Sequence, residues 1–116
     1  MLATKYRIPK EEIAPLLKKG ESLVSKLFII RCKENDKNFF RYRVIISRKV
    51  DTKAVKRNLL RRQSYEAIRI NSPKEREKNN FDIVLIPKKS ILSSSFQSIS
   101  KDIEENIIKK LHGKNE

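Results

Sequence analysis

The sequence contains no tryptophan, one cysteine, one histidine and two glycines among its 116 residues. The lone Cys32 cannot form an intramolecular disulfide, and we expect it to be a small, half-buried apolar side chain. His112 has no second histidine with which to share a metal ion, so we expect no metal site on the protein. No apolar run approaches the roughly 20 residues of a membrane-spanning helix. The opening residues also lack the apolar stretch of a signal peptide, so we predict a cytoplasmic location.

Acidic residues are scarce beside basic ones. The chain has 28 Lys and Arg against 14 Asp and Glu, which gives a formal net charge of +14. Such a protein repels itself when folded and typically binds a polyanion, with nucleic acid as the first candidate and an anionic membrane surface as a distant one. The acids are scattered along the sequence, and a nuclease needs positioned acids, a general base or a metal site. We therefore expect no catalytic residue in this chain.

The first half of the chain predicts one helix and two strands within a single domain, residues 1–116. A helix is expected after Pro9 and ends at Gly20. Pro15 interrupts it, so this helix is short, kinked or starts late. Two apolar segments, 22–32 and 39–47, then read as antiparallel strands joined by a polar turn.

The second of these strands alternates in character. One of its faces is apolar and comprises Phe40, Tyr42, Val44 and Ile46. The other face comprises Arg41, Arg43, Ile45 and Ser47. Because the second face is basic, we expect it to point toward solvent or a ligand.

The second half predicts a helix over 53–71, a charged connection over 72–80 and a buried strand over 82–86. A last helix is expected to start among Ser93, Ser94 and Ser95, which offer helix caps. The element order is α-β-β-α-β-α. This order indicates an α+β fold in which helices pack on one sheet.

The helix over 53–71 is the most informative segment. Seven basic residues and one acid lie between Arg48 and Arg62. Like charges one turn apart cost a few tenths of a kcal/mol per pair, so this helix needs a counter-anion. Arginine suits that role because its planar guanidinium grips phosphate bidentately and stacks on bases. The predicted RNA contacts are Arg48, Lys49, Lys53, Lys56, Arg57, Asn58, Arg61, Arg62, Tyr65 and Arg69. For Tyr65, stacking on a base and closing the edge of the core remain equal alternatives.

Residues 47–68, Ser-Arg-Lys-Val-Asp-Thr-Lys-Ala-Val-Lys-Arg-Asn-Leu-Leu-Arg-Arg-Gln-Ser-Tyr-Glu-Ala-Ile, resemble the signature of the bacterial ribonuclease P protein subunit. That family typically reads Ser-Lys-Lys-Val, a spacer, then Ala-Val-x-Arg-Asn-Arg-x-Lys-Arg-x-x-Arg-Glu-Ala. The matching positions are Ser47, Lys49, Val50, Ala54, Val55, Arg57, Asn58, Arg62, Glu66 and Ala67. The opening helix and the strand over 82–86 also resemble the family, so the likeness covers nearly the whole chain.

The resemblance implies an α+β, ribosomal protein S5 domain 2-like two-layer sandwich of order α-β-β-(β)-α-β-α, with a left-handed β-α-β crossover. It also implies a function: one protein, as a monomer in a 1:1 complex with the ribonuclease P RNA, assists removal of the 5′ leader from precursor tRNA. The RNA and its bound Mg²⁺ perform the hydrolysis. The basic helix binds that RNA, and a cleft holds the leader. The cleft positions are Ile13, Leu17, Arg31, Arg43, Ile45 and Ser47.

The sequence departs from the family pattern at two positions of the basic helix and at three positions of the cleft. Leu59 and Tyr65 stand where arginines are usual, Ile13 and Leu17 where Phe is frequent, and Arg31 where Tyr is frequent. Stacking on an aromatic ring is worth ~1–3 kcal/mol per base, so we expect weaker base contacts to the leader. Phosphate contacts are expected to compensate and to make binding more sensitive to salt, through Arg31, Arg41 and Arg43.

The alternative interpretation is a non-catalytic rRNA-binding or general RNA-binding module of the same fold. Ribosomal proteins are equally basic, so composition does not separate the two. Removing Arg57 or Arg62 is expected to abolish association with the catalytic RNA specifically if the resemblance holds, whereas a general binder would lose affinity evenly across RNAs.

Overall fold

The computed structural model describes residues 3–37, 39–71 and 80–108. Its regular elements, in chain order, are α1 (Ile13–Lys19), β1 (Glu21–Val24), β2 (Phe28–Asn35), β3 (Arg41–Val44), α2 (Ala54–Asn71), β4 (Asn80–Pro87) and α3 (Phe96–Ile103). Short turns accompany them: η1 (Thr4–Tyr6), η2 (Lys10–Glu12), η3 (Lys89–Ser93) and the π-helical η4 (Glu104–Ile108). His112 and most of the connection predicted over 72–80 lie outside the described residues.

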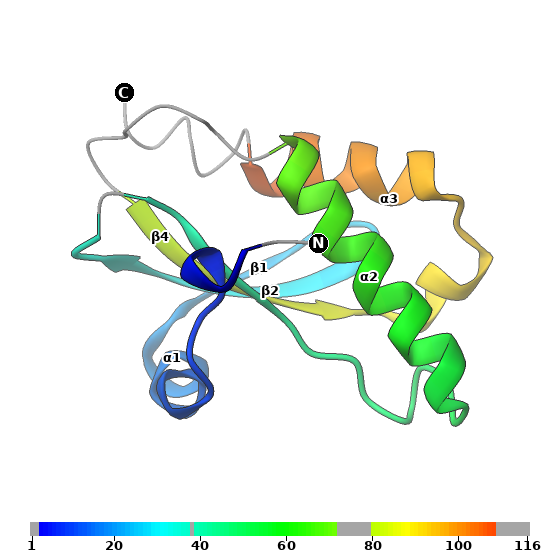
Figure 1. Ribbon diagram of the computed structural model, residues 1–116, viewed down its shortest axis with the longest axis horizontal. Coiled ribbons are helices and arrows are strands. Elements are labelled where there is room, and N and C mark those ends of the chain that lie inside the picture. Colours follow the sequence, from blue (N-terminus) through cyan, green and yellow to red (C-terminus); the bar gives the residue numbers. More distant parts are fainter. Residues whose placement is uncertain (1–2, 38, 72–79, 109–116) are drawn as a thin grey trace.

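The four strands form one sheet in the order β1-β2-β4-β3 (Figure 1). β2 pairs antiparallel with β1 and β4, and β3 pairs parallel with β4. Helix α2 connects these two parallel neighbours, as a parallel pair requires. The predicted α+β class is confirmed, and so is the optional extra strand before the second helix. The left-handed sense of the crossover stays a prediction.

The predictions for the segments 22–32 and 39–47 were wrong in two respects, the number of strands and their pairing. The apolar segment 22–32 is a hairpin of two strands rather than one strand, because the chain turns between Ser25 and Leu27. The Asp102 carboxylate holds this turn by accepting hydrogen bonds from Ser25 Oγ at 2.8 Å and Leu27 N–H at 3.1 Å. The segment 39–47 does not pair with the strand before it. β4 lies between the two, and β3 ends at Val44.

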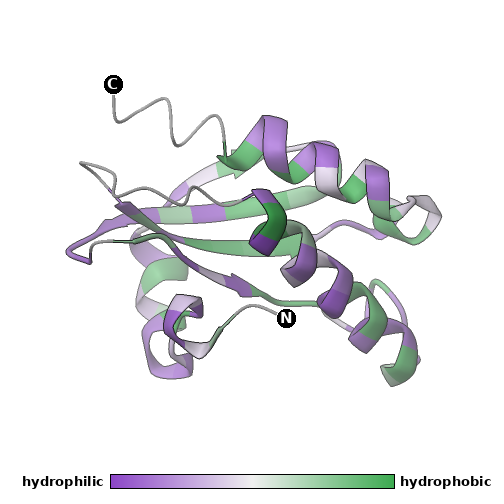
Figure 2. Ribbon diagram, turned by 45° about the horizontal axis from the view of Figure 1, so that its top comes forward, coloured by the Kyte–Doolittle hydropathy of each residue, from purple (hydrophilic) through white to green (hydrophobic). Residues whose placement is uncertain are grey.

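Helices α2 and α3 cover one face of the sheet and enclose the larger core. The predicted apolar face of the segment 39–47, which contains β3, is confirmed, since Phe40, Tyr42, Val44 and Ile46 are all buried. The core-facing side chains of the helices are buried as well: Leu60, Ser64, Ala67 and Ile68 in α2, Ile99 and Ile103 in α3, and Ile107 in η4, whereas Phe96 at the start of α3 is half-buried. Figure 2 shows these hydrophobic stretches along the strands and α3, with hydrophilic positions interspersed along α2. The buried hydroxyl of Ser64 donates to the Leu60 carbonyl oxygen, so it costs little in the core.

Helix α1 lies against the opposite face (Figure 1). Its core there is small, with Ile8, Leu16 and Val84 buried. The helix is short and starts late, as one of the predicted alternatives stated, and Pro15 falls in its first turn, where no backbone donor is needed. At Gly20 an added Cβ would lie 2.6 Å from the Leu16 carbonyl oxygen, so close approach of the backbone demands glycine here.

The open edge of β3 is protected by two contacts from outside the sheet. The N-terminal segment forms a parallel bridge at Arg7 to Tyr42, and Ile8 N–H donates to the Tyr42 carbonyl at 3.0 Å. Helix α2 supplies the other contact, because the Tyr65 hydroxyl accepts from Val44 N–H at 3.1 Å. These bonds satisfy backbone groups that would otherwise template association with another strand.

Candidate nucleic-acid interface

A cleft of about 640 Å³ lies between α1, β3 and α2. Its lining residues are Lys10, Ile13, Ala14, Leu17, Arg43, Val44, Ile45, Ile46 and Arg61. Aliphatic side chains thus meet three cations around one concave surface. Neither Lys10 nor Arg43 makes a hydrogen bond or ion pair with the described residues, which leaves both charges available to an anion.

The structure brings four of the six predicted cleft residues together: Ile13, Leu17, Arg43 and Ile45. The other two do not line the cleft. The guanidinium of Arg31 donates to the carbonyl oxygens of Leu17 at 2.6 Å and Gly20 at 3.1 Å, so it caps the carboxyl end of α1. Ser47 is exposed, and its hydroxyl accepts from Lys49 N–H at 3.2 Å.

Two cleft cations were not predicted at this place. Lys10 reaches the cleft from η2, and its position depends on how α1 docks, which no local sequence pattern specifies. Arg61 was assigned to the basic helix alone. Because it also lines the cleft, α2 and the cleft share one continuous surface.

The arginines of α2 differ in the hydrogen bonds that their guanidinium groups make within the protein. Arg57 donates to the backbone carbonyls of Asp51 at 2.9 Å and Thr52 at 2.8 Å, so it holds the loop that enters the helix. Arg61 donates to the side-chain oxygen of Asn58 at 2.8 Å. Arg62 is exposed and makes no such bond with the described residues. Among these three, Arg62 is the most available to a phosphate.

Arg69 forms an exposed ion pair with Glu66 one turn earlier on α2. The hydrogen bond from Arg69 lowers the pKa of the Glu66 carboxyl, and the same bond raises the pKa of Arg69. Glu66 therefore supplies an intramolecular counter-charge to one arginine of the basic helix, beyond the stretch from Arg48 to Arg62. The remaining residues predicted to contact RNA lie in α2 and in the segment before it. Four of them are exposed, namely Arg48, Lys49, Lys53 and Asn58, and Lys56 is half-buried.

The prediction that Tyr65 contacts RNA is wrong. Its side chain is 3% exposed and lies in the main core, where its hydroxyl bonds to the β3 backbone. The second alternative, closure of the core edge, is therefore confirmed. The helical spacing that grouped Tyr65 with the arginines did not reveal that β3 passes beside this part of α2.

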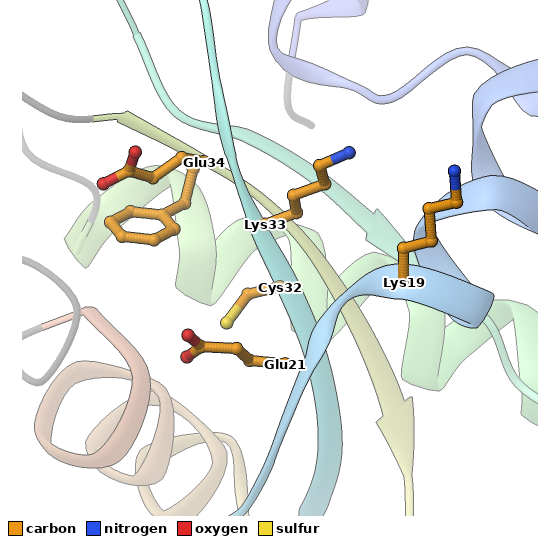
Figure 3. A pocket seen from close by; sticks show the side chains of 6 residues that line it. Lys19, Glu21, Cys32, Lys33 and Glu34 are labelled. Atoms are coloured by element: carbon orange, nitrogen blue, oxygen red, sulfur yellow. The ribbon is translucent and has the colours of Figure 1, made fainter.

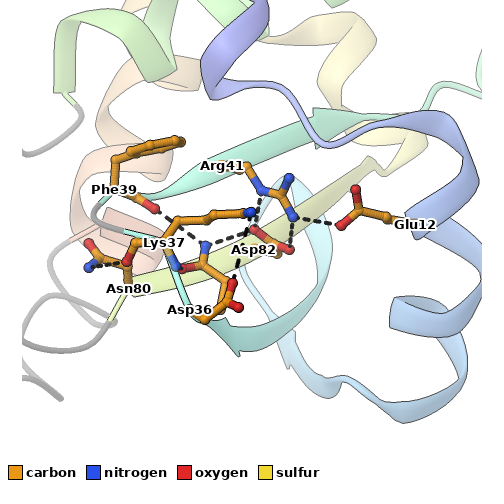
Figure 4. Close-up of polar contacts among 8 residues, drawn as sticks. Glu12, Asp36, Lys37, Phe39, Arg41, Asn80 and Asp82 are labelled. Atoms are coloured by element: carbon orange, nitrogen blue, oxygen red, sulfur yellow. Dashed lines mark hydrogen bonds and ion pairs between the residues drawn. The ribbon is translucent and has the colours of Figure 1, made fainter.

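Arg41 is not available to RNA phosphates either. Its side chain is 8% exposed and donates to both oxygens of Asp82, at 2.8 and 2.7 Å, and to Glu12 at 2.9 Å. Figure 4 shows Arg41 between these two carboxylates. The hydrogen bond to Asp82 raises the pKa of the Arg41 guanidinium above its ordinary value, with Glu12 adding to the effect. The scattered positions of the acids along the sequence did not predict that a second carboxylate would lie near Asp82. Glu12 lies there because both acids share this arginine.

A second cavity of about 530 Å³ has a different character (Figure 3). It is lined by Lys19, Glu21, Cys32, Lys33, Glu34 and Phe81. Two acids beside two lysines do not favour a polyanion. Cys32 is 1% exposed, so it is more deeply buried than expected. Within 3–37, 39–71 and 80–108 no three acidic, cysteine or histidine side chains gather as a metal site, and no helix is long and apolar enough to span a bilayer.

Fold and surface together define a small basic α+β domain in which a cation-lined cleft adjoins an arginine-rich helix. The family model described as Ribonuclease P matches residues 2–112. The ribonuclease P protein component of Clostridium kluyveri is 35% identical over 106 residues, covering 90% of this chain and 93% of that protein. The corresponding protein of Clostridioides difficile is 36% identical over 93 residues, covering 80% of this chain and 79% of its own.

Solved structures agree with these relatives. The ribonuclease P protein from Thermotoga maritima superposes with a TM-score of 0.74 at 28% identity, covering 90% of this chain and 96% of that one. The chain therefore belongs to the ribonuclease P protein family, the protein components of a tRNA-processing ribonucleoprotein that performs an endonucleolytic reaction. As such a component it works with the ribonuclease P RNA.

Proposed function

We propose that this chain binds the ribonuclease P RNA through α2 and holds the 5′ leader of precursor tRNA in the cleft beside α1. The RNA and its Mg²⁺ carry out leader removal, and the protein contributes binding and orientation. The observation that carries this proposal is the position of Arg61, which belongs to the arginine-rich helix and also lines the cleft. The protein surface proposed to bind the catalytic RNA thus continues into the cleft, where the extended leader of the precursor tRNA would lie.

The cleft suits a leader bound mainly by its phosphates. Lys10 and Arg43 offer charges that no residue in the described part of the chain pairs, and Ile13, Leu17 and Ile45 offer aliphatic contact without an aromatic ring. Stacking on aromatic rings is worth ~1–3 kcal/mol per base, so this floor discriminates poorly between bases. Since Arg31 and Arg41 are bonded within the protein, we now assign the expected salt sensitivity to Lys10 and Arg43.

The decisive experiment is reconstitution. The protein is mixed with a bacterial ribonuclease P RNA, and cleavage of precursor tRNA is measured at low Mg²⁺ with and without it. Restoration of leader removal that the RNA alone does not sustain supports the proposal. Binding without any effect on cleavage would instead favour the rRNA-binding alternative. The mass of the reconstituted complex in solution tests the proposed 1:1 composition.

Three charge-removing variants separate the two surfaces. Arg62→Ala is expected to weaken binding of the catalytic RNA and to lower the salt slope of log Kd by about 1. Arg43→Ala is expected to weaken binding of precursor tRNA to the assembled complex while leaving binding of mature tRNA unchanged. Lys26→Ala removes the same charge from the exposed turn between β1 and β2 and is the matched control. Equal losses in all three variants would contradict the division into two surfaces.

A further inference from the structure

A third concave surface lies where α2 faces the start of α3. It has a volume of about 470 Å³ and is lined by Leu59, Arg62, Gln63, Glu66 and Phe96. The four α2 residues follow one another at i, i+3, i+4 and i+7, so they share one stripe of the helix. Phe96 is the first residue of α3. We call this surface the α2–α3 groove.

The apolar part of the groove is Leu59 together with Phe96. Leu59 is 43% exposed, and it stands where the family resemblance has an arginine. Phe96 is half-buried and packs on its inner side against the main core. A single exposed leucine is ordinary on a protein surface. Here, however, the leucine and an aromatic ring line the same hollow, which gives the groove an apolar lining.

The polar part of the groove comprises Arg62, Gln63 and Glu66. Arg62 and Gln63 make no hydrogen bond or ion pair with the described residues. Glu66 is bound to Arg69 and closes the groove with a neutralised pair. An apolar lining with a few convergent polar groups, in a volume between ~300 and ~1,000 Å³, is typical of a site for a small ligand.

We propose that the α2–α3 groove binds one unpaired nucleobase of the ribonuclease P RNA; this inference rests on the proposed function of α2. The base packs against Leu59 and the Phe96 ring, the Gln63 amide bonds to its edge, and Arg62 contacts the adjoining phosphate. Unpaired bases of RNA are recognised in this way, by packing against apolar or aromatic side chains and by hydrogen bonds to their edges.

Charge favours RNA over a protein partner as the occupant. The groove adjoins the helix that carries Lys56, Arg57, Arg61 and Arg62, in a chain of net charge +14. A polyanion drawn to that helix by its phosphates places its bases within reach of the groove. Leu59 thus exchanges a phosphate contact, available to an arginine, for contact with a base.

The test combines affinity with base-specific chemical modification of the catalytic RNA, using Leu59→Ser and a matched control. Val55→Ser removes a more exposed aliphatic side chain, 82% exposed, from α2 outside the groove. Both positions are exposed, so both variants should fold. Leu59→Ser is expected to weaken RNA binding about fivefold with an unchanged salt slope, and to re-expose one base that the wild type protects. Val55→Ser is expected to keep that protection.

A third variant sharpens the distinction between base and phosphate contact. Leu59→Arg is expected to lose the protected base and to raise the salt slope by about 1, because a phosphate contact replaces it. Absence of any base whose protection depends on Leu59 would overturn the inference. So would loss of self-association on Leu59→Ser, since that result would identify a second protein copy as the occupant. If the wild type binds no ribonuclease P RNA at all, the proposed function itself fails.

Discussion

The two faces of the sheet are built by different means. The face under α2 and α3 is a continuous apolar core in which Leu85, Ile30 and Ile68 are completely buried. The face under α1 has only a small apolar cluster and relies on charged groups. Arg41 ties Glu12, which precedes α1, to Asp82 in β4, and Arg31 binds the last carbonyls of α1.

This difference corresponds to the functions proposed for each face. An apolar core fixes α2, so its outer arginines keep their spacing whatever they bind. On the other face, sparse packing leaves room for a cleft beside α1, and hydrogen bonds set the position of that helix without filling the space. Hydrogen bonds from charged groups therefore position the helix on this face, whereas apolar packing positions the helices on the other.

The largest difference in stability between the two faces is expected from a Leu→Ala substitution made on each. Leu85→Ala removes a fully buried side chain from the central strand, and Leu16→Ala removes one from α1. Leu→Ala costs ~2–5 kcal/mol depending on how far the site can collapse. We expect about 4 kcal/mol at Leu85 and about 2 kcal/mol at Leu16, from denaturant unfolding. Equal costs would show that the two faces are packed alike.

Removal of the central cation tests the charged face directly. Arg41→Ala leaves Asp82 and Glu12 without their shared partner, and breaking a buried pair costs ~3 kcal/mol. Because the pKa of Arg41 is raised, its contribution is complete below the ordinary arginine pKa and is lost only above it. The loss should thus be the same from about pH 6 to about pH 9. Arg69→Ala, which breaks an exposed pair on α2, should change stability little. A comparable loss at Arg69 would contradict this account.

The sequence correctly predicted the structural elements that are determined by residues close together in the chain. The alternation over 39–47 identified the buried face of this segment correctly, and the helical pattern over 53–71 identified α2. The serines before α3 identified its start, where Ser95 Oγ accepts from Ser98 N–H at 3.2 Å. In each case the residues that form the structure lie within a few positions of one another.

What the sequence did not reveal depends on distant residues. The turn at Ser25 contains no glycine or proline, and it is held by Asp102, 77 positions away. The role of Arg41 depends on Asp82, 41 positions away, and the two meet only because β3 pairs parallel with β4. In the candidate site, Tyr65 was misplaced for the same reason. Helical spacing grouped it with the arginines, whereas its burial depends on β3, which is distant in the sequence.

Tyr65 lies at the boundary between the core and the basic helix, and its hydroxyl gives a sharper test. Tyr65→Phe keeps the ring but leaves the Val44 N–H of β3 without its acceptor. An unsatisfied buried donor costs ~1–3 kcal/mol, and we expect about 1.5 kcal/mol in thermal unfolding. Affinity for the ribonuclease P RNA should be unchanged, since the side chain is buried. Reduced RNA affinity with unchanged stability would restore Tyr65 to the interface.

A smaller effect on stability than at Tyr65 is expected at Arg31. Arg31→Met keeps the aliphatic stem and removes the donor to Leu17 and Gly20 at the end of α1. The Nε of Arg31 is buried without a partner among the described residues, and this penalty offsets part of the gain from those bonds. We expect a loss of about 1 kcal/mol in unfolding, with faster hydrogen exchange confined to α1. The salt dependence of leader binding should be unaltered, whereas Arg43→Met should reduce it. A reduced salt slope at Arg31 would mean that its guanidinium leaves the α1 carbonyls for a phosphate of the leader.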